Sequence, residues 1–462
     1  MAFVSLNPAT GRRLSTHLPH SARQTAASLE AAHTEYRAWS ATTLKHRATL
    51  LRRLARALRA EQPALAATIT DEVGKPIVQA EAEIEKSAAG CEYYAKHGPA
   101  FLSPELPPGA PPPARVFFAP LGVVLAIMPW NFPVWQAIRA VAPALLAGNT
   151  VLLKPAPNTA GVSRALERIF HTAGFARGAF QVALVNPPAV QALIADPRIA
   201  GVTLTGSTRA GRAVAAAAGA ALKPVVLELG GSDAYVVLAD ADLDQAAEIC
   251  AQARLVNSGQ SCVAAKRFIV DRRVQQDFEV RLVARIAARR VGDPRARDTE
   301  VGPLARADLR AELHRQVTAS VRRGARVLLG GQPMSGAGFF YEPTVLTRVR
   351  PGMPVHDEEV FGPVAAVIGV RDEEAALLAA NRSVYGLGAA VFTRDRRRAA
   401  RVAHALEAGF VAINDFVRSD PALPFGGVKQ SGIGRELGAW GARSFVNVKT
   451  LVGATPASRV RA

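Results

Sequence analysis

The 462-residue chain is poor in cysteine, and its three thiols (Cys91, Cys250 and Cys262) are far apart, with no CxxC pair or Cys/His cluster. An odd and scattered set excludes a disulfide framework and gives no sign of a structural zinc site, so no metal is expected. The N-terminal segment MAFVSLNPATGRR lacks the apolar core of a signal peptide, and the apolar stretch Leu121–Trp130 is too short to span a bilayer. We therefore expect a cytoplasmic protein with free thiols and no membrane partner.

Lysine is scarce as well: nine lysines stand beside 47 arginines, and the net charge is +18. Clustered cations can bind nucleic acid by releasing counterions from phosphate, whereas a dispersed basic surface only keeps a protein soluble. Arginine runs such as Arg396–Arg398 stand among alanines at helical spacing and have no interleaved aromatic residues. The second interpretation is favoured, and we expect no nucleic-acid partner.

The hydrophobic content of 49% is ordinary for a globular protein, and at ~150 residues per domain the length predicts about three domains. Residues 21–97 have helical periodicity, and Pro99–Pro113 carries seven prolines that interrupt regular structure. From Leu121, and again from Ala234, short apolar strands alternate with helices. This pattern predicts α/β bodies with parallel sheets covered on both faces. An extended strip, Ser444–Val452, follows the last glycine-rich loop.

Three residues carry candidate covalent chemistry. Cys262 lies in the polar loop Gly259-Gln260-Ser261-Cys262, where an inert core thiol is less expected than a nucleophile. Glu228 ends an apolar strand, where a carboxylate is either an acid/base group of raised pKa or a group that needs a partner. Asn131, in the turn Pro129–Pro133, offers an amide that can stabilise an oxyanion. Each also has a structural interpretation, as a buried thiol, a paired acid or an ordinary turn residue.

A candidate phosphate-binding turn, Thr205–Gly211, follows a predicted strand and opens a helix. Its sequence TGSTRAG lacks the GxGxxG spacing of the usual dinucleotide fingerprint, because Ser207 replaces the second glycine. Ser207 is equally compatible with a simple helix N-cap. Lys154 ends another predicted strand, at the sheet edge where ligands of parallel sheets bind.

Seven motifs occur together in one order: PWNFP, KPAP, TGSTRAG, ELGG, GQSC, EEVFGPV and PFGGVKQSGIGRE. This ordered set resembles the aldehyde dehydrogenase superfamily along nearly the whole chain. Within it, the chain is most similar to short bacterial NAD(P)-dependent succinate-semialdehyde dehydrogenases.

The resemblance implies a mechanism. Cys262 would attack the aldehyde, the Asn131 amide and the Cys262 N–H would hold the oxyanion, and Glu228 would activate the water that hydrolyses the thioester. Another aliphatic or aromatic aldehyde is the alternative substrate class. A CoA-acylating or phosphorylating enzyme would use the same cysteine without needing Glu228.

The resemblance also implies a cofactor, NAD or NADP. Pro157 stands where NAD-specific relatives often carry a glutamate that would repel a 2′-phosphate, so NADP stays open. The residues implied at this site are Trp130, Lys154, Pro157, Gly206, Ser207, Leu229, Glu359 and Phe361.

For succinic semialdehyde, the family pattern points to Arg139 and Ser419 as ligands of the substrate carboxylate. A second carboxylate-binding arginine of some relatives is Val256 in this chain, and Arg254 or Arg418 are possible substitutes. The alternative for Arg139 is an ion pair with a structural acid.

The fold implied has three parts: a Rossmann-like cofactor domain (residues 1–98 and 118–227), an α/β catalytic domain (228–440) and a small β oligomerisation element (99–117 and 441–462). Exposed edges in such an element pair between subunits, so a homodimer or homotetramer is expected.

Overall fold

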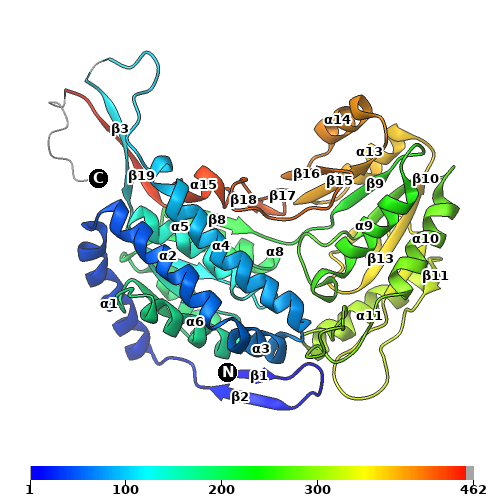
Figure 1. Cartoon of the computed structure of the whole chain (residues 1–462), viewed down its shortest axis with the longest axis horizontal. Coiled ribbons are helices and arrows are strands. Elements are labelled where there is room, and N and C mark those ends of the chain that lie inside the picture. Colours follow the sequence, from blue (N-terminus) through cyan, green and yellow to red (C-terminus); the bar gives the residue numbers. More distant parts are fainter. Residues whose placement is uncertain (1, 112, 454–462) are drawn as a thin grey trace.

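The computed structural model describes residues 2–111 and 113–453 and contains two α/β bodies, each built on its own sheet (Figure 1). An antiparallel ribbon of β3 (Arg115–Pro120) and β19 (Val446–Leu451) extends away from the first body. Among the described residues, no helix is both long enough and apolar enough to cross a membrane.

The first sheet has six strands in the order β18-β8-β7-β4-β5-β6, and all neighbours except β18 and β8 run parallel. Without β18, the chain order across the sheet is 3-2-1-4-5, which is the Rossmann-like arrangement. Its central strand β4 is buried along its whole length, as expected for a strand covered on both faces. The strands are β4 (Val123–Ile127), β5 (Thr150–Lys154), β6 (Phe180–Val182), β7 (Ile199–Thr205), β8 (Val225–Glu228) and β18 (Gly432–Ile433).

The helices of the first body come from three parts of the chain: before the strands of this sheet, between them, and close to the C-terminus. α1 begins with a capping box in which Ser21 and Gln24 satisfy each other's backbone N–H groups. The helices are α1 (Ala22–Ser40), α2 (Leu44–Ala60), α3 (Gln62–Val73), α4 (Ile77–Phe101), α5 (Trp135–Ala147), α6 (Ala160–Thr172), α7 (Pro187–Ala195), α8 (Thr208–Ala220) and α15 (Gly438–Arg443).

Helix α4 runs through Pro99, beyond the point where the proline-rich stretch was predicted to interrupt regular structure. A helical proline lacks the N–H that would bond to the carbonyl four residues earlier. That carbonyl, of Ala95, accepts a hydrogen bond from Arg52 Nη2 at 3.1 Å instead. A neighbouring helix therefore compensates for the lost backbone bond.

The second sheet has seven strands in the order β11-β12-β13-β10-β9-β15-β16, and only β11 and β12 pair antiparallel. The strands are β9 (Ala234–Val237), β10 (Arg267–Asp271), β11 (Arg326–Leu329), β12 (Thr344–Thr347), β13 (Val364–Val370), β15 (Gly388–Phe392) and β16 (Phe410–Ile413). The helices are α9 (Leu243–Leu255), α10 (Gln275–Ala287), α11 (Ala307–Arg322), α12 (Pro354–Asp357), α13 (Glu373–Asn381) and α14 (Arg396–Ala405). The predicted combination of a Rossmann-like body and a second α/β body is confirmed.

Three short pairings complete the structure. β1 (Phe3–Leu6) pairs with β2 (Arg13–His17), β14 (Tyr385–Gly386) pairs with β17 (Val428–Lys429), and β3 pairs with β19. The β3–β19 ribbon joins the end of the proline-rich excursion to the C-terminal strip. Residues 1, 112 and 454–462 of the predicted domains lie outside the described residues, and the domain boundaries stay predictions.

Candidate active site

Four candidate residues lie at or just beyond the carboxyl ends of neighbouring strands in the first sheet. Asn131 follows β4, Lys154 ends β5, Ser207 follows β7 and Glu228 ends β8. Because β4, β5, β7 and β8 are parallel, these ends meet at one edge. The strand order reverses between β4 and β7, and ligands of such sheets bind at that point.

Cys262 reaches this edge from the second body, in the loop between α9 and β10. A short 3-10 turn, η2 (Val256–Gly259), precedes it, with Asn257, Ser258 and Gly259 in the left-handed region at φ of 51°, 55° and 76°. A Cβ on Gly259 would lie 2.3 Å from the carbonyl oxygen of Gly362, so this tight turn requires glycine. The turn reverses the chain and brings Cys262, which is partly exposed, to the wall of a cavity.

A buried lysine holds the cysteine loop. The ammonium of Lys266, a side chain that is 1% exposed, donates to the carbonyl oxygens of Ser261 at 3.1 Å, Cys262 at 2.7 Å and Ala264 at 3.0 Å. Three acceptors satisfy the three donors of an ammonium group. Lys266 therefore orders the backbone on both sides of Cys262.

Burial raises the pKa of the Cys262 thiol to about 12. The positive charges of Arg139 and Lys266 act in the opposite direction, whereas the carboxylates of Glu228 and Glu359 add to the rise. Desolvation disfavours the thiolate and the two cations favour it. Reactivity at neutral pH therefore depends on the cations that surround the thiol.

Asn131 is tied directly to the loop of Cys262. Its side-chain Nδ2 donates to the carbonyl of Gln260 at 3.0 Å, and its own carbonyl accepts from Asn257 Nδ2 at 2.9 Å. An amide nitrogen carries two hydrogens, so the second stays available for an oxyanion. The structure thus joins two motifs that are far apart in sequence.

Glu228 is 1% exposed, and within the described residues neither of its carboxylate oxygens has a hydrogen-bond partner. Burial raises its pKa well above the ordinary value, with a further rise from Glu436 and an opposing effect of Arg139. A buried carboxylate with free lone pairs is a poor structural element. It is suited to accept a proton from a water molecule.

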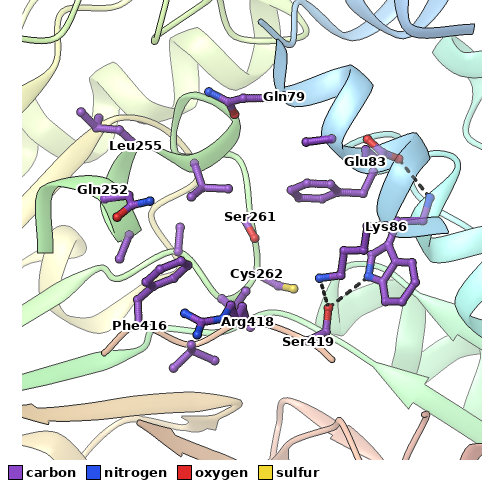
Figure 2. A pocket seen from close by; sticks show the side chains of 18 of the residues that line it. Gln79, Glu83, Lys86, Gln252, Leu255, Ser261, Cys262, Phe416, Arg418 and Ser419 are labelled. Carbon is purple, nitrogen blue, oxygen red and sulfur yellow. Dashed lines mark hydrogen bonds between the residues drawn. The ribbon is translucent and has the colours of Figure 1, made fainter. Parts of the chain in front are cut away.

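A cavity of about 630 Å³ opens beside Cys262 between the two bodies, and Figure 2 shows the side chains around it. Of the residues predicted from sequence, Cys262, Arg139, Ser419 and the possible substitute Arg418 line it. Arg254 is not among the lining residues. It is fully buried and donates to the carbonyl of Gly259 at 2.6 Å, so it supports the η2 turn.

Arg139 shows the ion pair that the sequence analysis kept as its alternative. Its guanidinium, on α5, pairs with Glu436 and donates to Thr205 Oγ1 at 3.2 Å. The side chain is 3% exposed. A substrate carboxylate would have to compete with Glu436 for this arginine, and its role in substrate binding stays a prediction.

The residues predicted for the cofactor surround the carboxyl edge of the first sheet. Ser207 caps α8 by accepting from the Ala210 N–H at 3.3 Å, and the Gly206 N–H donates to the Glu228 carbonyl at 2.9 Å. Leu229 packs on α8 so closely that a Cβ on Gly211 would lie 2.5 Å from it. This glycine thus permits the tight helix–strand packing that dinucleotide folds need.

The remaining cofactor candidates come from both bodies. Trp130 meets Phe361 edge to face, with ring centroids 5.7 Å apart, and Glu359 accepts from the Gly231 N–H at 2.9 Å. Burial lowers the pKa of Lys154, and it forms no ion pair within the described residues. Pro157 begins the 3-10 helix η1 (Pro157–Thr159) and is exposed.

Sequence reasoning missed several residues of the site, including Glu83, Lys86, Lys266 and Glu436. Lys86 and Glu83 lie within a periodic helix, and Glu436 closes a glycine-rich motif, so none of them stands out by spacing. Only Lys266 had a signal, as a charged residue directly before the fully buried strand β10.

Three comparisons agree with this geometry. The family model described as "Aldehyde dehydrogenase family" matches residues 1–451. The chain is 48% identical over 448 residues to the succinate semialdehyde dehydrogenase Sad, specific for NAD(P)+, of Escherichia coli K12, covering 97% of both proteins. It is 44% identical to a probable NADP+-dependent succinate-semialdehyde dehydrogenase of Synechocystis, covering 98% of this chain and 99% of that protein.

Among solved structures, Gox0499 superposes with a TM-score of 0.96 at 41% identity, covering 98% of this chain and 100% of that one. A succinic semialdehyde dehydrogenase of Streptococcus pyogenes in complex with NADP+ gives a TM-score of 0.94 at 35% identity, covering 97% of this chain and 99% of that one. The match spans the sheets, the cysteine loop and the motifs alike, and the chain belongs to the aldehyde dehydrogenase family.

Proposed function

We propose that this protein oxidises succinic semialdehyde to succinate with NAD+ or NADP+ as the hydride acceptor. The observation that carries the proposal is that residues of the first body meet the loop of Cys262, which lines the cavity: Asn131 donates to the Gln260 carbonyl of that loop, and the Glu228 carboxylate is close enough to raise the pKa of the Cys262 thiol. The substrate follows from the relatives, which are named succinate-semialdehyde dehydrogenases.

In the first half of the reaction, the Cys262 thiolate attacks the aldehyde carbon and forms a thiohemiacetal. In this proposal the free N–H of the Asn131 amide and the backbone N–H of Cys262 stabilise the oxyanion. In known enzymes a single such donor contributes about 3–4 kcal/mol. The Lys266 contacts support this step by ordering the backbone that carries the Cys262 N–H.

A bound nicotinamide cofactor would supply the hydride acceptor for this chemistry, and loss of a hydride from the thiohemiacetal would leave a thioester on Cys262. The chain has groups that fit it: the capped N-terminus of α8 at Ser207 for the pyrophosphate, the unpaired Lys154 for the adenosine ribose, and Glu359 for the nicotinamide ribose. Pro157 presents no negative charge to a 2′-phosphate, which supports use of NADP as well as NAD.

In the second half, Glu228 takes a proton from a water molecule, which attacks the thioester carbon and releases the acid with the Cys262 thiolate as leaving group. The two free carboxylate oxygens of Glu228 support this role. Because its raised pKa leaves it protonated in acid, deacylation should slow as the pH falls toward and below that pKa.

The test combines substrate and mechanism. Initial rates with succinic semialdehyde, butanal and benzaldehyde, each with NAD+ and NADP+, should give the highest kcat/KM for succinic semialdehyde. Glu228→Gln should give one burst of reduced cofactor per subunit and then little turnover, because the thioester forms but is not hydrolysed. Glu374→Gln, on the exposed start of α13, is the matched control. A normal steady state in Glu228→Gln, or a product that needs CoA or phosphate, would contradict the proposal.

The same proposal covers the assembly. The β3–β19 ribbon exposes Val448, at 60%, and Trp440 of α15, the helix just before β19 in the chain, is 63% exposed. We expect these apolar side chains to be covered by another subunit in a homodimer or homotetramer. Sedimentation of the intact protein measures this directly, and a cytoplasmic location stays a prediction.

A further inference from the structure

The cavity beside Cys262 is lined by five cationic side chains, and four of them are already paired. Arg139 pairs with Glu436, and Arg418 pairs with Asp415 at 2.9 Å. The other two also bind carboxylates within the chain, namely Arg289 to Glu248 and Glu300, and Arg297 to Glu81. Lys86 is the fifth, and within the described residues no carboxylate lies within ion-pair distance of it.

Lys86 projects from α4 into one corner of the cavity, near Ser419 (Figure 2). Trp135 lines the same corner. Its Nζ donates to Ser419 Oγ at 2.9 Å and lies 4.7 Å from the centroid of the Trp135 ring. One of its three N–H donors is thus engaged by a neutral acceptor. The others stay available, so the corner holds a desolvated positive charge that lacks a counter-ion.

The Ser419 hydroxyl is able to donate a hydrogen bond to an anion. It accepts from Lys86 and, at 3.0 Å, from the indole Nε1 of Trp135. An ammonium and an indole N–H can only donate, so they occupy both lone pairs of the hydroxyl. The hydroxyl must then offer its own hydrogen to a third group, and a carboxylate oxygen is an acceptor of that kind.

We propose that Lys86, together with the Ser419 hydroxyl, binds the carboxylate at the far end of the substrate and so makes the enzyme selective for aldehydes that carry one. This inference rests on the proposed function, and it assigns to Lys86 the part that the sequence analysis gave to Arg139. Arg139 pairs with Glu436, whereas Lys86 forms no ion pair within the part of the chain that the structure describes.

Because Lys86 can lose its proton, the preference for aldehydes that carry a carboxylate should depend on pH. Burial lowers the pKa of Lys86 to about 8, and the charges facing it are Arg139 of α5, Arg418 and Asp420 of the loop after β16, and Glu83 of its own helix. The arginines lower the pKa and the carboxylates raise it. Lys86 is therefore charged below about pH 8 and loses its charge above it, so affinity for a carboxylate should fall as the pH rises through this range.

The experiment measures kcat/KM for succinic semialdehyde and for butanal, which has the same carbon chain without the carboxylate, from pH 6.5 to 9.5. The ratio of the two values removes the titration of Cys262 and Glu228, which both substrates share. The variants are Lys86→Met, Lys86→Arg and, as the matched control on the exposed side of α4, Lys96→Met.

In the parent enzyme the ratio should decline above pH 8. Lys86→Met should lower kcat/KM for succinic semialdehyde by about 10- to 100-fold, mainly through KM, because a charge-assisted contact is lost. Its activity on butanal should stay within about 3-fold, and its ratio should be low at every pH. Lys86→Arg should restore a high ratio that no longer falls at alkaline pH.

Equal losses for both aldehydes in Lys86→Met, or a ratio that Lys86→Met leaves unchanged, would overturn the assignment of Lys86 while the proposed function stands. A parent enzyme with no preference for succinic semialdehyde would overturn the proposed function itself. Lys96→Met should match the parent in every measurement.

Discussion

Lys75, a buried residue just before α4, and Lys86, a half-buried residue within α4, have opposite surroundings. Lys75 is ion-paired with Glu83 and lies 3.8 Å from the centroid of the Phe132 ring, and Glu83 in turn accepts from the backbone N–H groups of Val134 and Trp135. Lys86 forms no ion pair among the described residues; its ammonium donates to the Ser419 hydroxyl and lies over the Trp135 ring. The charge of Lys75 is compensated within the fold, so that removal of its partner would leave a buried charge unpaired. The charge of Lys86 is available to a ligand.

The Lys75–Glu83 ion pair also contacts the helix that follows Asn131. Glu83 binds the two N–H groups at the start of α5, directly after the turn that carries Asn131. It therefore caps a helix that lacks a side-chain cap of its own at Val134. We therefore expect the Lys75–Glu83 pair to position Asn131, the proposed oxyanion donor, whereas Lys86 is the proposed ligand of the substrate carboxylate.

The largest expected effect comes from removing Cys262, the proposed nucleophile. Cys262→Ala should lower turnover by roughly 10³-fold or more, because the covalent route is lost. Circular dichroism and cofactor binding should be unchanged, since the partly exposed thiol contributes little packing. Dehydrogenase activity within tenfold of the parent would show that Cys262 is not the nucleophile.

Removing the partner of Lys75 should lower the free energy of unfolding more than removing the charge of Lys86. Glu83→Gln leaves the Lys75 ammonium buried without its counter-ion, and removal of one partner of such a pair costs about 3–5 kcal/mol. The midpoint of urea unfolding should fall accordingly, and Lys75→Met in the same chain should restore part of the loss. Lys86→Met should cost less than about 1 kcal/mol, because no ion pair is broken.

Equal changes of the urea midpoint in Glu83→Gln and Lys86→Met would contradict this contrast between Lys75 and Lys86. A further check is catalytic: Glu83→Gln should lower kcat for both succinic semialdehyde and butanal, as expected of a positioning residue near Asn131. Lys86→Met should distinguish between the two aldehydes.

The smallest expected effect concerns Lys266, a buried lysine of the cysteine loop. Lys266 binds three carbonyl groups around Cys262, and its charge lowers the pKa of the thiol. In Lys266→Met the pH profile of Cys262 alkylation by iodoacetamide should shift to higher pH, and the rate at pH 8 should fall about 3- to 10-fold. Lys266→Arg should restore part of the rate, and an unchanged profile would show that Lys266 is only structural.

Local patterns were sufficient to predict much of the fold. The apolar run Thr150–Leu153 predicts a strand and the run Trp135–Leu146, followed by Gly148, predicts a helix. The structure has β5 (Thr150–Lys154) and α5 (Trp135–Ala147) at these places. Continuous apolar runs and a terminating glycine are signals carried by adjacent residues. Strands β1 and β2 had no such signal, since β2 has no buried residue and forms only by pairing with β1.

The order of the motifs and the chemistry of their residues, a thiol in a polar loop, an acid after an apolar strand and an amide in a turn, were determined by the sequence alone. These properties belong to single side chains and their immediate neighbours. Which cation meets the substrate was decided only by the tertiary structure. Arg139 is matched by Glu436, and Lys86 meets Ser419, through contacts between residues hundreds of positions apart. Whether a buried charge is compensated depends on partners that folding brings within a few ångströms, and no local spacing records them.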